Sequence, residues 1–270
     1  MDTGSGHSSD PRHQASDEEF ARRLLSGEMH AGMRLGRRVL RHLPTDPRCK
    51  LCAAPFRGPF GPIMRAVGKG PWPNNPKYCK MCLNQLVKHH GGAEIECSLL
   101  FADVRDSTQL AESMRPAEFR SLMGHFFATA TAVLVDHEAI VDKYVGDEVI
   151  GIFVPLLTGE LHAARAVAAG IALLKAVAGD PRGGIGVRVG AGVHTGLAYV
   201  GTVGDGEMVD LTAMGDPVNV TARLASAAAA GELLASLDAA RAAGIDTTSL
   251  EHRSLALKGK SEATEVVVLH

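Results

Sequence analysis

Two pairs of cysteines constrain the first third of this 270-residue chain more than any other feature. The pairs are Cys49-x2-Cys52 and Cys79-x2-Cys82. Each such turn can point two sulfurs at one ion, and two turns together complete a tetrahedral site. The residues around them are rich in Gly and Pro and offer too little apolar surface to fold unaided. We therefore predict a zinc-ribbon-like module and linker over residues 48–92, ordered by a structural Zn²⁺.

Other states of these cysteines stay open. The spacing also resembles rubredoxin-like iron sites, although Ala53 and Leu83 stand where that family usually has Gly. Reduced thiols or a disulfide switch are further alternatives, and they would suit a metal or redox sensor. Cys97 differs from the four because it lies between Ile95 and Leu99 on an expected strand, so we predict a core residue.

The N-terminal residues divide into an expected tail and an expected helical segment. Residues 1–16 are mainly Gly, Ser, His and Asp, which predicts a disordered tail. Residues 17–47 predict a helical segment that breaks at Gly27 or Gly36 and stops at its prolines. Its basic side, formed by Arg34, Arg37, Arg38 and Arg41, is expected to be solvated rather than to bind an anion.

From residue 93 onward, apolar runs typical of strands alternate with helical patterns. Strands are expected at 94–104, in a hairpin at 139–154, at 186–196 and at 264–270, with helices at 116–138, 160–179 and 217–230. This alternation predicts a mixed sheet covered by helices. The hydrophobic content of 46% allows a substantial core. We assign residues 93–270 to one α+β domain.

Bulk properties exclude several classes of partner. A net charge of −2 favours neither nucleic acid nor an anionic membrane surface. The polar, acidic start has no apolar signal-peptide core, and we find no run typical of a membrane span, so a cytoplasmic protein without membrane insertion is expected. The stretch GPIMRAVGKG has the wrong glycine spacing for a phosphate-binding P-loop.

Two aspartates each lie at the end of an apolar run. Asp103 ends LLFAD, and Asp147 lies in the tight turn of VDKYVGDEVIGIF. Each alone is more often a structural turn residue. Together they would supply the hard oxygen ligands that Mg²⁺ requires. Whether they act together depends on the remaining motifs.

Those motifs resemble the class III nucleotidyl cyclases. FADVRDST resembles the first metal loop of the family, DKYVGDEVIGIF its second metal hairpin, GVHTG with MGDPVNVTARL its strand and transition-state helix, and LKGKSEATEVVVL its closing phosphate-lysine segment. The motifs occur in family order over residues 95–269. The resemblance implies a ferredoxin-like core that works as a head-to-tail homodimer with two shared sites.

The resemblance also implies the metal chemistry. Asp103, Asp147 and the Val104 carbonyl would hold two Mg²⁺ or Mn²⁺ ions, and amides of residues 104–108 would cradle the triphosphate. The reaction is attack of the ribose 3′-hydroxyl on the α-phosphate, with diphosphate leaving. Asn219 would orient the ribose and Arg223 would meet the charge developing at the α-phosphate.

Base choice is implied by Lys143 and Thr212. A lysine with a threonine is the adenine-selective pattern, since the lysine donates to adenine N1 and the hydroxyl accepts from the exocyclic amine. ATP is therefore the expected substrate, and Lys258 would bind its terminal phosphates.

Two departures from the family pattern favour weaker substrate binding. Asp106 replaces the usual Gly of the first loop, and Glu207 and Met208 occupy the segment where many members have an Arg. A catalytically silent, nucleotide-binding regulatory module is therefore the alternative to an adenylate cyclase active in signal transduction.

Overall fold

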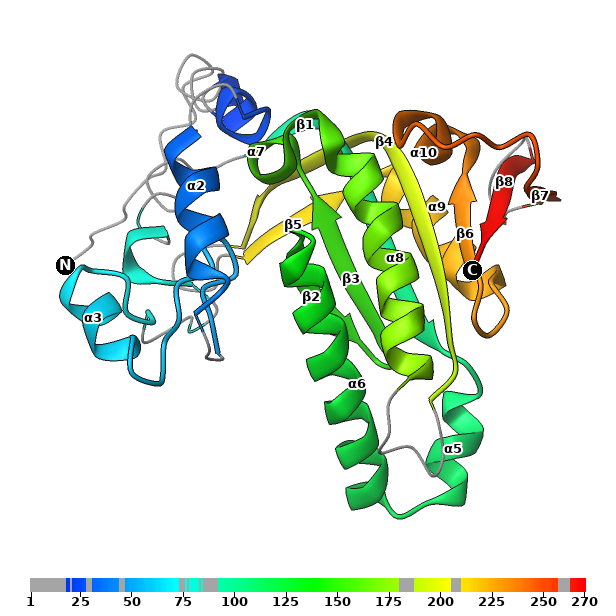
Figure 1. The fold of residues 1–270 in the computed structure, drawn as a ribbon, viewed down its shortest axis with the longest axis horizontal. Coiled ribbons are helices and arrows are strands. Elements are labelled where there is room, and N and C mark those ends of the chain that lie inside the picture. The colour runs from blue at the N-terminus through cyan, green and yellow to red at the C-terminus, as the bar shows by residue number, and fades with distance from the viewer. Residues whose placement is uncertain are drawn as a thin grey trace, which may run out of the picture.

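The computed structural model describes residues 18–19, 21–27, 31–43, 47–72, 76, 78–82, 84, 92–179, 187–204, 210–256 and 263–270. The predicted tail lies outside these residues. Figure 1 shows the N-terminal elements grouped to one side of a larger part built on a sheet.

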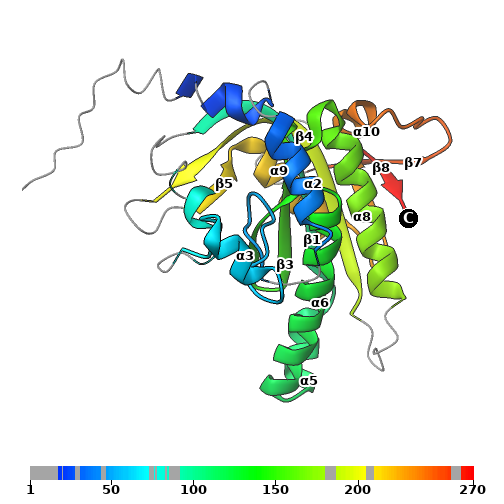
Figure 2. The same cartoon turned by 60° about the vertical axis from the view of Figure 1, so that its left-hand side comes forward.

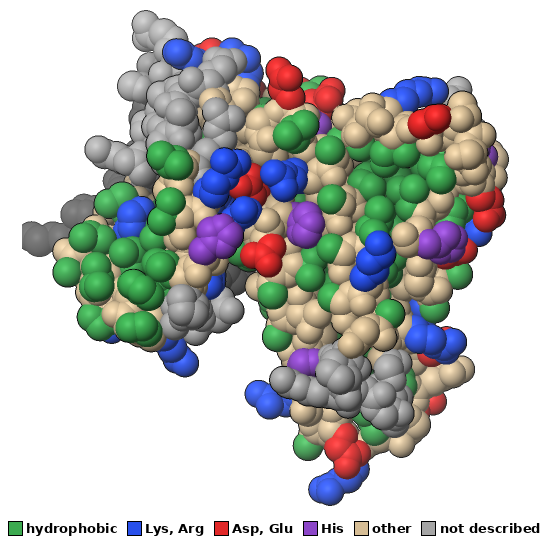
Figure 3. Space-filling view, viewed as in Figure 1, with side chains coloured by type: hydrophobic (Ala, Val, Ile, Leu, Met, Phe, Trp, Pro, Cys, Tyr) green, Lys and Arg blue, Asp and Glu red, His purple; other side chains and the backbone are tan. Residues whose placement is uncertain are grey.

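The N-terminal segment is helical, with its break at Gly27. Residues 21–25 are helical, Gly27 has a positive φ of 84°, and helix α2 then runs over Ala31–Leu40. Gly36 lies inside α2 and does not interrupt it. A second short helix, α3, spans Gly61–Ala66 within the cysteine-containing segment. Hydrophobic side chains gather on the surface over this helix (Figure 3), where Ile63 is 53% exposed.

The expected solvation of the arginine side of α2 is wrong for Arg37 and Arg41. Arg37 is only 3% exposed, and its guanidinium donates to the carbonyls of Lys50 and Leu51 at 3.1 and 2.5 Å and of Ala139 at 2.5 Å. Arg41 donates to the Asp136 carbonyl at 2.6 Å. These arginines therefore attach α2 to the first cysteine turn and to the segment between α6 and β2.

One eight-stranded sheet forms the larger part, with the order β2-β3-β1-β4-β6-β8-β7 and β5 paired to β4. The strands are β1 (Gly92–Val104), β2 (Ile140–Val145), β3 (Glu148–Phe153), β4 (Val189–Val203), β5 (Asp210–Met214), β6 (Leu233–Ser236), β7 (Glu251–Leu255) and β8 (Thr264–Leu269). The helices are α5 (Ser107–Ser113), α6 (Pro116–Asp136), α7 (Pro155–Thr158), α8 (His162–Ala178), α9 (Asp216–Ala227) and α10 (Leu237–Ala242). Only β4 and β6 are paired in parallel among the described strands.

The chain order β1-α6-β2-β3-α8-β4, with strands arranged β4-β1-β3-β2, is the ferredoxin-like core. The predicted mixed sheet covered by helices is therefore confirmed. The short strands β5, β6 and β7 and helix α10 were not predicted.

Helices α6, α8 and α10 cover one face of this sheet, and the cysteine segment covers the other together with α7 and α9. On β1, Leu100 and Ala102 pack into a core with α6, α8 and α10, whereas Leu99 and Phe101 face a second core that includes the cysteine segment. Cys97 is fully buried in that second core, as predicted, and burial raises its pKa to about 12. Figures 1 and 2 show α6 and α8 side by side along the sheet.

The expectation that no run is typical of a membrane span is wrong by length and composition for Pro155–Ala178, which includes α7 and α8 and has an 18-residue window with a mean hydropathy of 1.5. In the described structure 44% of that window is buried, and α8 supplies Ala166, Leu173 and Leu174 to the core beneath the sheet. A buried core helix of a globular domain has this same composition.

Candidate active site and four-cysteine centre

The two predicted metal aspartates are brought together where β1 ends and β3 begins. Asp103 is near the end of β1, and its register partner on β3 is Glu148, the residue after Asp147. The β2–β3 turn is tight because Gly146 adopts a positive φ of 62°. Burial raises the pKa of Asp103, Arg105 acts in the opposite direction, and the nearby Asp147 carboxylate adds to the rise.

Two further charged groups adjoin these aspartates and were not singled out from the sequence. Burial, followed by the charges of Asp103 and Asp147, raises the pKa of Glu148 to about 7. Arg105 pairs with the Asp103 carboxylate and donates to the Ser226 carbonyl at 2.9 Å. One arginine beside three carboxylates leaves excess negative charge, which a cation would neutralise.

Asp106, the departure in the first loop, adopts a backbone conformation that favours glycine. Its φ is +58°, the left-handed region that Gly and, next to it, Asp and Asn tolerate best. Its carboxylate pairs with Arg188, so its added charge is partly neutralised. Within the loop, the amides of Val104 and Arg105 already donate to carbonyls of Asp147 and Arg188, at 3.4 and 2.7 Å. These two amides are therefore engaged, and of the five amides expected to cradle a triphosphate, those of residues 106–108 lie at the start of α5.

Helix α9 presents Asn219 and Arg223 one turn apart on the same side. Asn219 is exposed and Arg223 is half-buried. The helix packs backbone to backbone on β4, because a Cβ at Gly192 would lie 2.4 Å from the amide nitrogen of Ala225. This close approach holds the two side chains at a fixed position on the sheet.

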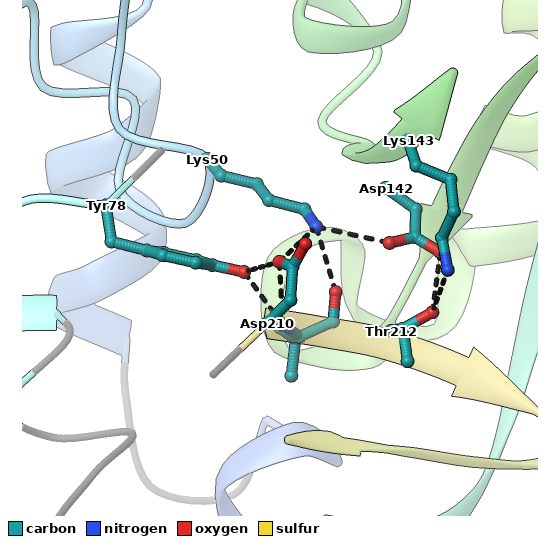
Figure 4. A network of polar contacts seen from close by, with 7 residues as sticks. Lys50, Tyr78, Asp142, Lys143, Asp210 and Thr212 are labelled. Atoms are coloured by element: carbon teal, nitrogen blue, oxygen red, sulfur yellow. Dashed lines mark hydrogen bonds and ion pairs between the residues drawn. The ribbon is translucent and has the colours of Figure 1, made fainter. Parts of the chain in front are cut away.

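Lys143 of β2 and Thr212 of β5 meet although 69 residues separate them. The Lys143 ammonium lies 3.0 Å from the Thr212 hydroxyl oxygen, which donates to Asp142 at 2.7 Å. The Lys143 side chain is 44% exposed, whereas that of Asp142 is 4% exposed. The two residues of the predicted base-reading pair thus lie together within one chain, with a buried carboxylate behind them (Figure 4).

Behind Asp142, the network continues into the cysteine segment (Figure 4). Lys50 contacts Asp142 at 3.2 Å, Asp210 at 2.9 Å and the Leu211 carbonyl at 2.9 Å. Tyr78 donates to Asp210 at 2.5 Å and accepts from the Leu211 amide at 2.8 Å. Sequence reasoning missed Lys50, Tyr78, Asp142 and Asp210. The only sequence feature that could have indicated a role was their position: Lys50 and Tyr78 are each next to a cysteine, and Asp142 is next to Lys143.

Two predicted features lie outside the described residues. These are Lys258, expected to bind phosphate, and the segment that contains Glu207 and Met208.

The four cysteines of the two Cys-x2-Cys pairs form one buried cluster. Their sulfur atoms all lie within 4.8 Å of one another, and those of Cys52 and Cys79 are 3.7 Å apart. A tetrahedral Zn²⁺ with bonds of about 2.3 Å has sulfur–sulfur edges of about 3.8 Å, so this donor set fits one ion. Hydrogen bonds within the cluster lower the pKa of Cys52 and Cys79 and raise that of Cys49 and Cys82, so Cys52 and Cys79 are the two thiols that ionise more readily.

The backbone of the first cysteine turn also has the form expected for a metal site. Ala53 stands where rubredoxin-like iron sites usually have Gly, and it nevertheless adopts a positive φ of 58°. Its amide donates to the Cys49 carbonyl at 2.9 Å, while the Cys49 amide donates to the Ala54 carbonyl at 2.9 Å. The Lys69 ammonium lies 3.9 Å from the Cys52 sulfur, where it would balance thiolate charge.

Comparisons with known proteins agree with this fold. Residues 92–270 match the family model of the adenylate and guanylate cyclase catalytic domain. The chain therefore belongs to the adenylate and guanylate cyclase catalytic-domain family. It is 30% identical to adenylate cyclase 1 of Rhizobium meliloti over 148 residues, which are 50% of this chain and 22% of that protein. The adenylate cyclase of Anabaena cylindrica is 30% identical over 135 residues, 47% of this chain and 26% of that protein. The chain thus spans about a quarter of the length of these curated relatives.

Solved cyclase structures share the architecture. The guanylyl cyclase Cya2 has a TM-score of 0.62 at 25% identity, covering 66% of this chain and 93% of that one. The adenylyl cyclase CyaB of P. aeruginosa has a TM-score of 0.59 at 26% identity, covering 66% and 96%. Both base specificities are thus represented among these structures, and the choice of base rests on side chains.

Proposed function

We propose that this chain is an adenylate cyclase that converts ATP to 3′,5′-cyclic AMP and diphosphate in intracellular signal transduction. The observation that carries the proposal is the contact between Lys143 and Thr212. An exposed ammonium and a hydroxyl oxygen side by side can donate to adenine N1 and accept from the adenine amine. Guanine presents a carbonyl oxygen where adenine has its amine, so this pair suits ATP better.

The adjoining carboxylates of Asp103 and Asp147, with the Val104 carbonyl, fit two Mg²⁺ or Mn²⁺ ions by their oxygen chemistry. When bound, such ions activate the attacking hydroxyl and stabilise charge on the phosphate oxygens. The raised pKa of Asp103 supports the fit, because a buried and partly repelled carboxylate gains most from a cation nearby.

The chain's own residues then position the substrate. Asn219 holds the ribose so that its 3′-oxygen approaches the α-phosphate in line with the leaving diphosphate. Arg223 donates to the α-phosphate oxygens, where charge increases as the new bond forms. Lys258 holds the terminal phosphates.

A head-to-tail homodimer with two shared sites is part of the proposal. Large apolar side chains are exposed on the two hairpin arms near the site: Tyr144, Val145, Leu197, Val203 and Met214 are 41–61% exposed. Such surfaces favour docking of a partner, and a second copy of this chain makes the contact isologous. Asp103 and Asp147 of one subunit would then act with Asn219 and Arg223 of the other.

The four-cysteine centre is proposed to hold one structural Zn²⁺, and the chain to act in the cytoplasm without inserting into a membrane. The closed, buried set of four sulfurs supports a structural site. A reducing compartment would keep the thiols available for metal.

Cyclic nucleotide formation from ATP and from GTP, with Mg²⁺ or Mn²⁺, tests the function. We expect cyclic AMP as the main product, and its loss in Asp103→Ala or Asp147→Ala, because each removes one of two metal carboxylates. Asp238→Ala is the matched control, since that aspartate is 70% exposed on α10. Nucleotide binding without any cyclic product would refute the proposal and favour the silent regulatory module.

A further inference from the structure

The hydroxyl group of Thr212 has its hydrogen-bonding roles fixed by its neighbours. A hydroxyl has one hydrogen to donate and two lone pairs to accept with. The ammonium of Lys143 can only donate, so it uses one lone pair of Thr212 at 3.0 Å. The carboxylate of Asp142 can only accept, so it takes the single hydrogen at 2.7 Å. Toward a nucleobase, Thr212 is therefore left with one lone pair and is an acceptor only.

An acceptor at this position discriminates between the two purines. Adenine carries an amine that donates, whereas guanine carries a carbonyl oxygen that accepts. Thr212 can pair with the first but would place two acceptors against each other with the second. Were the hydroxyl hydrogen free, Thr212 could rotate and donate to guanine instead. The preference thus depends on the group that holds this hydrogen.

Asp142 is kept in place by the four-cysteine centre. Its side chain is 4% exposed, and a buried carboxylate needs compensating charge and donors. Lys50, whose side chain is 5% exposed, supplies an ammonium 3.2 Å from Asp142 Oδ1, which leaves Oδ2 to Thr212. Lys50 is itself held by Asp210 and the Leu211 carbonyl.

The two cysteine turns differ in how they use the lysine that each contains. The sequences are Cys-Lys-Leu-Cys and Cys-Lys-Met-Cys, so Lys50 and Lys80 occupy equivalent positions. Lys50 is buried against the catalytic domain, whereas Lys80 is exposed. A substitution at Lys80 is therefore a matched control for the same substitution at Lys50, because it makes the same change of charge and side-chain length in the other cysteine turn.

Resting on the proposed adenylate cyclase activity, we propose that Asp142, positioned by Lys50 of the four-cysteine centre, determines the preference for adenine by fixing the polarity of the Thr212 hydroxyl. Asp142 and Lys50 are positioning residues, since neither needs to touch the nucleotide. The cysteine centre then contributes to substrate choice and is more than a structural appendage.

Asp142→Asn tests the role of the carboxylate. Because Lys50 only donates, the asparagine carbonyl must face Lys50 and its amide must face Thr212. The amide then donates to the Thr212 oxygen and releases the hydroxyl hydrogen toward the base. We expect the ratio of kcat/KM for ATP to that for GTP to fall about tenfold, the effect of one hydrogen bond that is lost on one purine and gained on the other.

Lys50→Met tests the link to the cysteine centre, with Lys80→Met as control. In the wild type the ammonium of Lys143 lies 3.3 Å from Asp142 Oδ2. Without Lys50 it becomes the only cation among the described residues beside that carboxylate, and it is drawn away from the base. We expect KM for ATP to rise and the ATP-to-GTP ratio to fall by about fivefold, with recovery in Lys50→Arg. Lys80→Met should match the wild type, and bound metal should be unchanged in all of these variants.

The preference for ATP over GTP can also be measured without turnover, from the equilibrium dissociation constants of the two nucleotides. If the protein forms no cyclic product, the proposed function is refuted, but these dissociation constants still test the inference. The inference is overturned if folded Asp142→Asn keeps the wild-type ratio within about twofold. Should that variant fail to fold, equal ratios in Lys50→Met and Lys80→Met overturn it instead. A fall in kcat alone, with the ratio unchanged, would indicate a merely structural contact.

Discussion

Replacing Arg37 by Met is expected to detach the N-terminal helix and the cysteine segment from the cyclase domain. Arg37 lies on α2, and its guanidinium contacts the carbonyls of Lys50 and Leu51 in the first cysteine turn and of Ala139 before β2. Methionine keeps most of the apolar side-chain volume and removes the donors. Three carbonyls that face the guanidinium would then lose a partner.

The size of the effect follows from two opposing contributions. Hydrogen bonds to a charged group contribute about 1.5–3 kcal/mol each, so three of them amount to roughly 4.5–9 kcal/mol. Burial lowers the pKa of Arg37 from 12.5 to about 10. This fall corresponds to roughly 3 kcal/mol against the buried charge. Its Nε atom also has no hydrogen-bond partner among the described residues. We therefore expect a loss of about 3 kcal/mol in the free energy of unfolding.

Urea unfolding followed by two signals would measure this loss. Trp72 is the single tryptophan of the chain and packs against the core that contains the cysteine segment, so its fluorescence reports that segment. Circular dichroism reports the helices, most of which belong to the cyclase domain. In Arg37→Met the tryptophan transition should move to lower urea and separate from the helical one. Arg38→Met is the control, because that side chain is 62% exposed and such changes cost below about 0.5 kcal/mol. Equal midpoints for the two variants would refute the reasoning.

The remaining predictions concern the shared site, the metal and acid stability. Mixing Asp103→Ala with Asn219→Ala protein should restore at most about a quarter of wild-type activity, since half of the dimers are mixed and each of these holds one intact site of two. No recovery of activity, despite demonstrated subunit exchange, would exclude shared sites. Cys79→Ser should lower bound zinc from about one ion per chain and change activity moderately, and metal-free wild-type protein would disprove the zinc site and favour a thiol switch. The hydrogen bonds from Arg253 lower the pKa of Glu232 to about 2. A lowered carboxyl pKa stabilises the fold above the ordinary value of 4.5, so this contribution should be lost as the pH falls from about 4.5 to 2, and Glu232→Gln should flatten that part of the pH–stability curve.

Much of the fold was predictable because it depends on local patterns. The apolar run of β1, the hairpin β2–β3 and the helices α6, α8 and α9 were each expected within a few residues of their observed bounds. Periodicity identifies long elements well, since each repeats its buried side several times. Strands β5, β6 and β7 have only four or five residues and were missed for the same reason.

The candidate site divides in the same way. Asp103 with Asp147, and Lys143 with Thr212, were recognisable as motif positions, and the structure brings the members of each pair together. The left-handed backbone at Ala53 and Asp106 could not be predicted from these residue types, because residues with a Cβ atom rarely adopt a positive φ.

By itself, the sequence determined the order of the motifs, the two cysteine turns and the types of residue available for chemistry. Only the tertiary structure decided that Arg37 is buried and that Lys50 reaches Asp142 and Asp210, which are 92 and 160 residues away along the chain. The physical reason is that an arginine or lysine has the same local pattern whether water or a distant carbonyl or carboxylate accepts its hydrogen bonds. Which acceptor it meets depends on the packing of the cysteine segment against the sheet, and that packing is not encoded in any single stretch of residues.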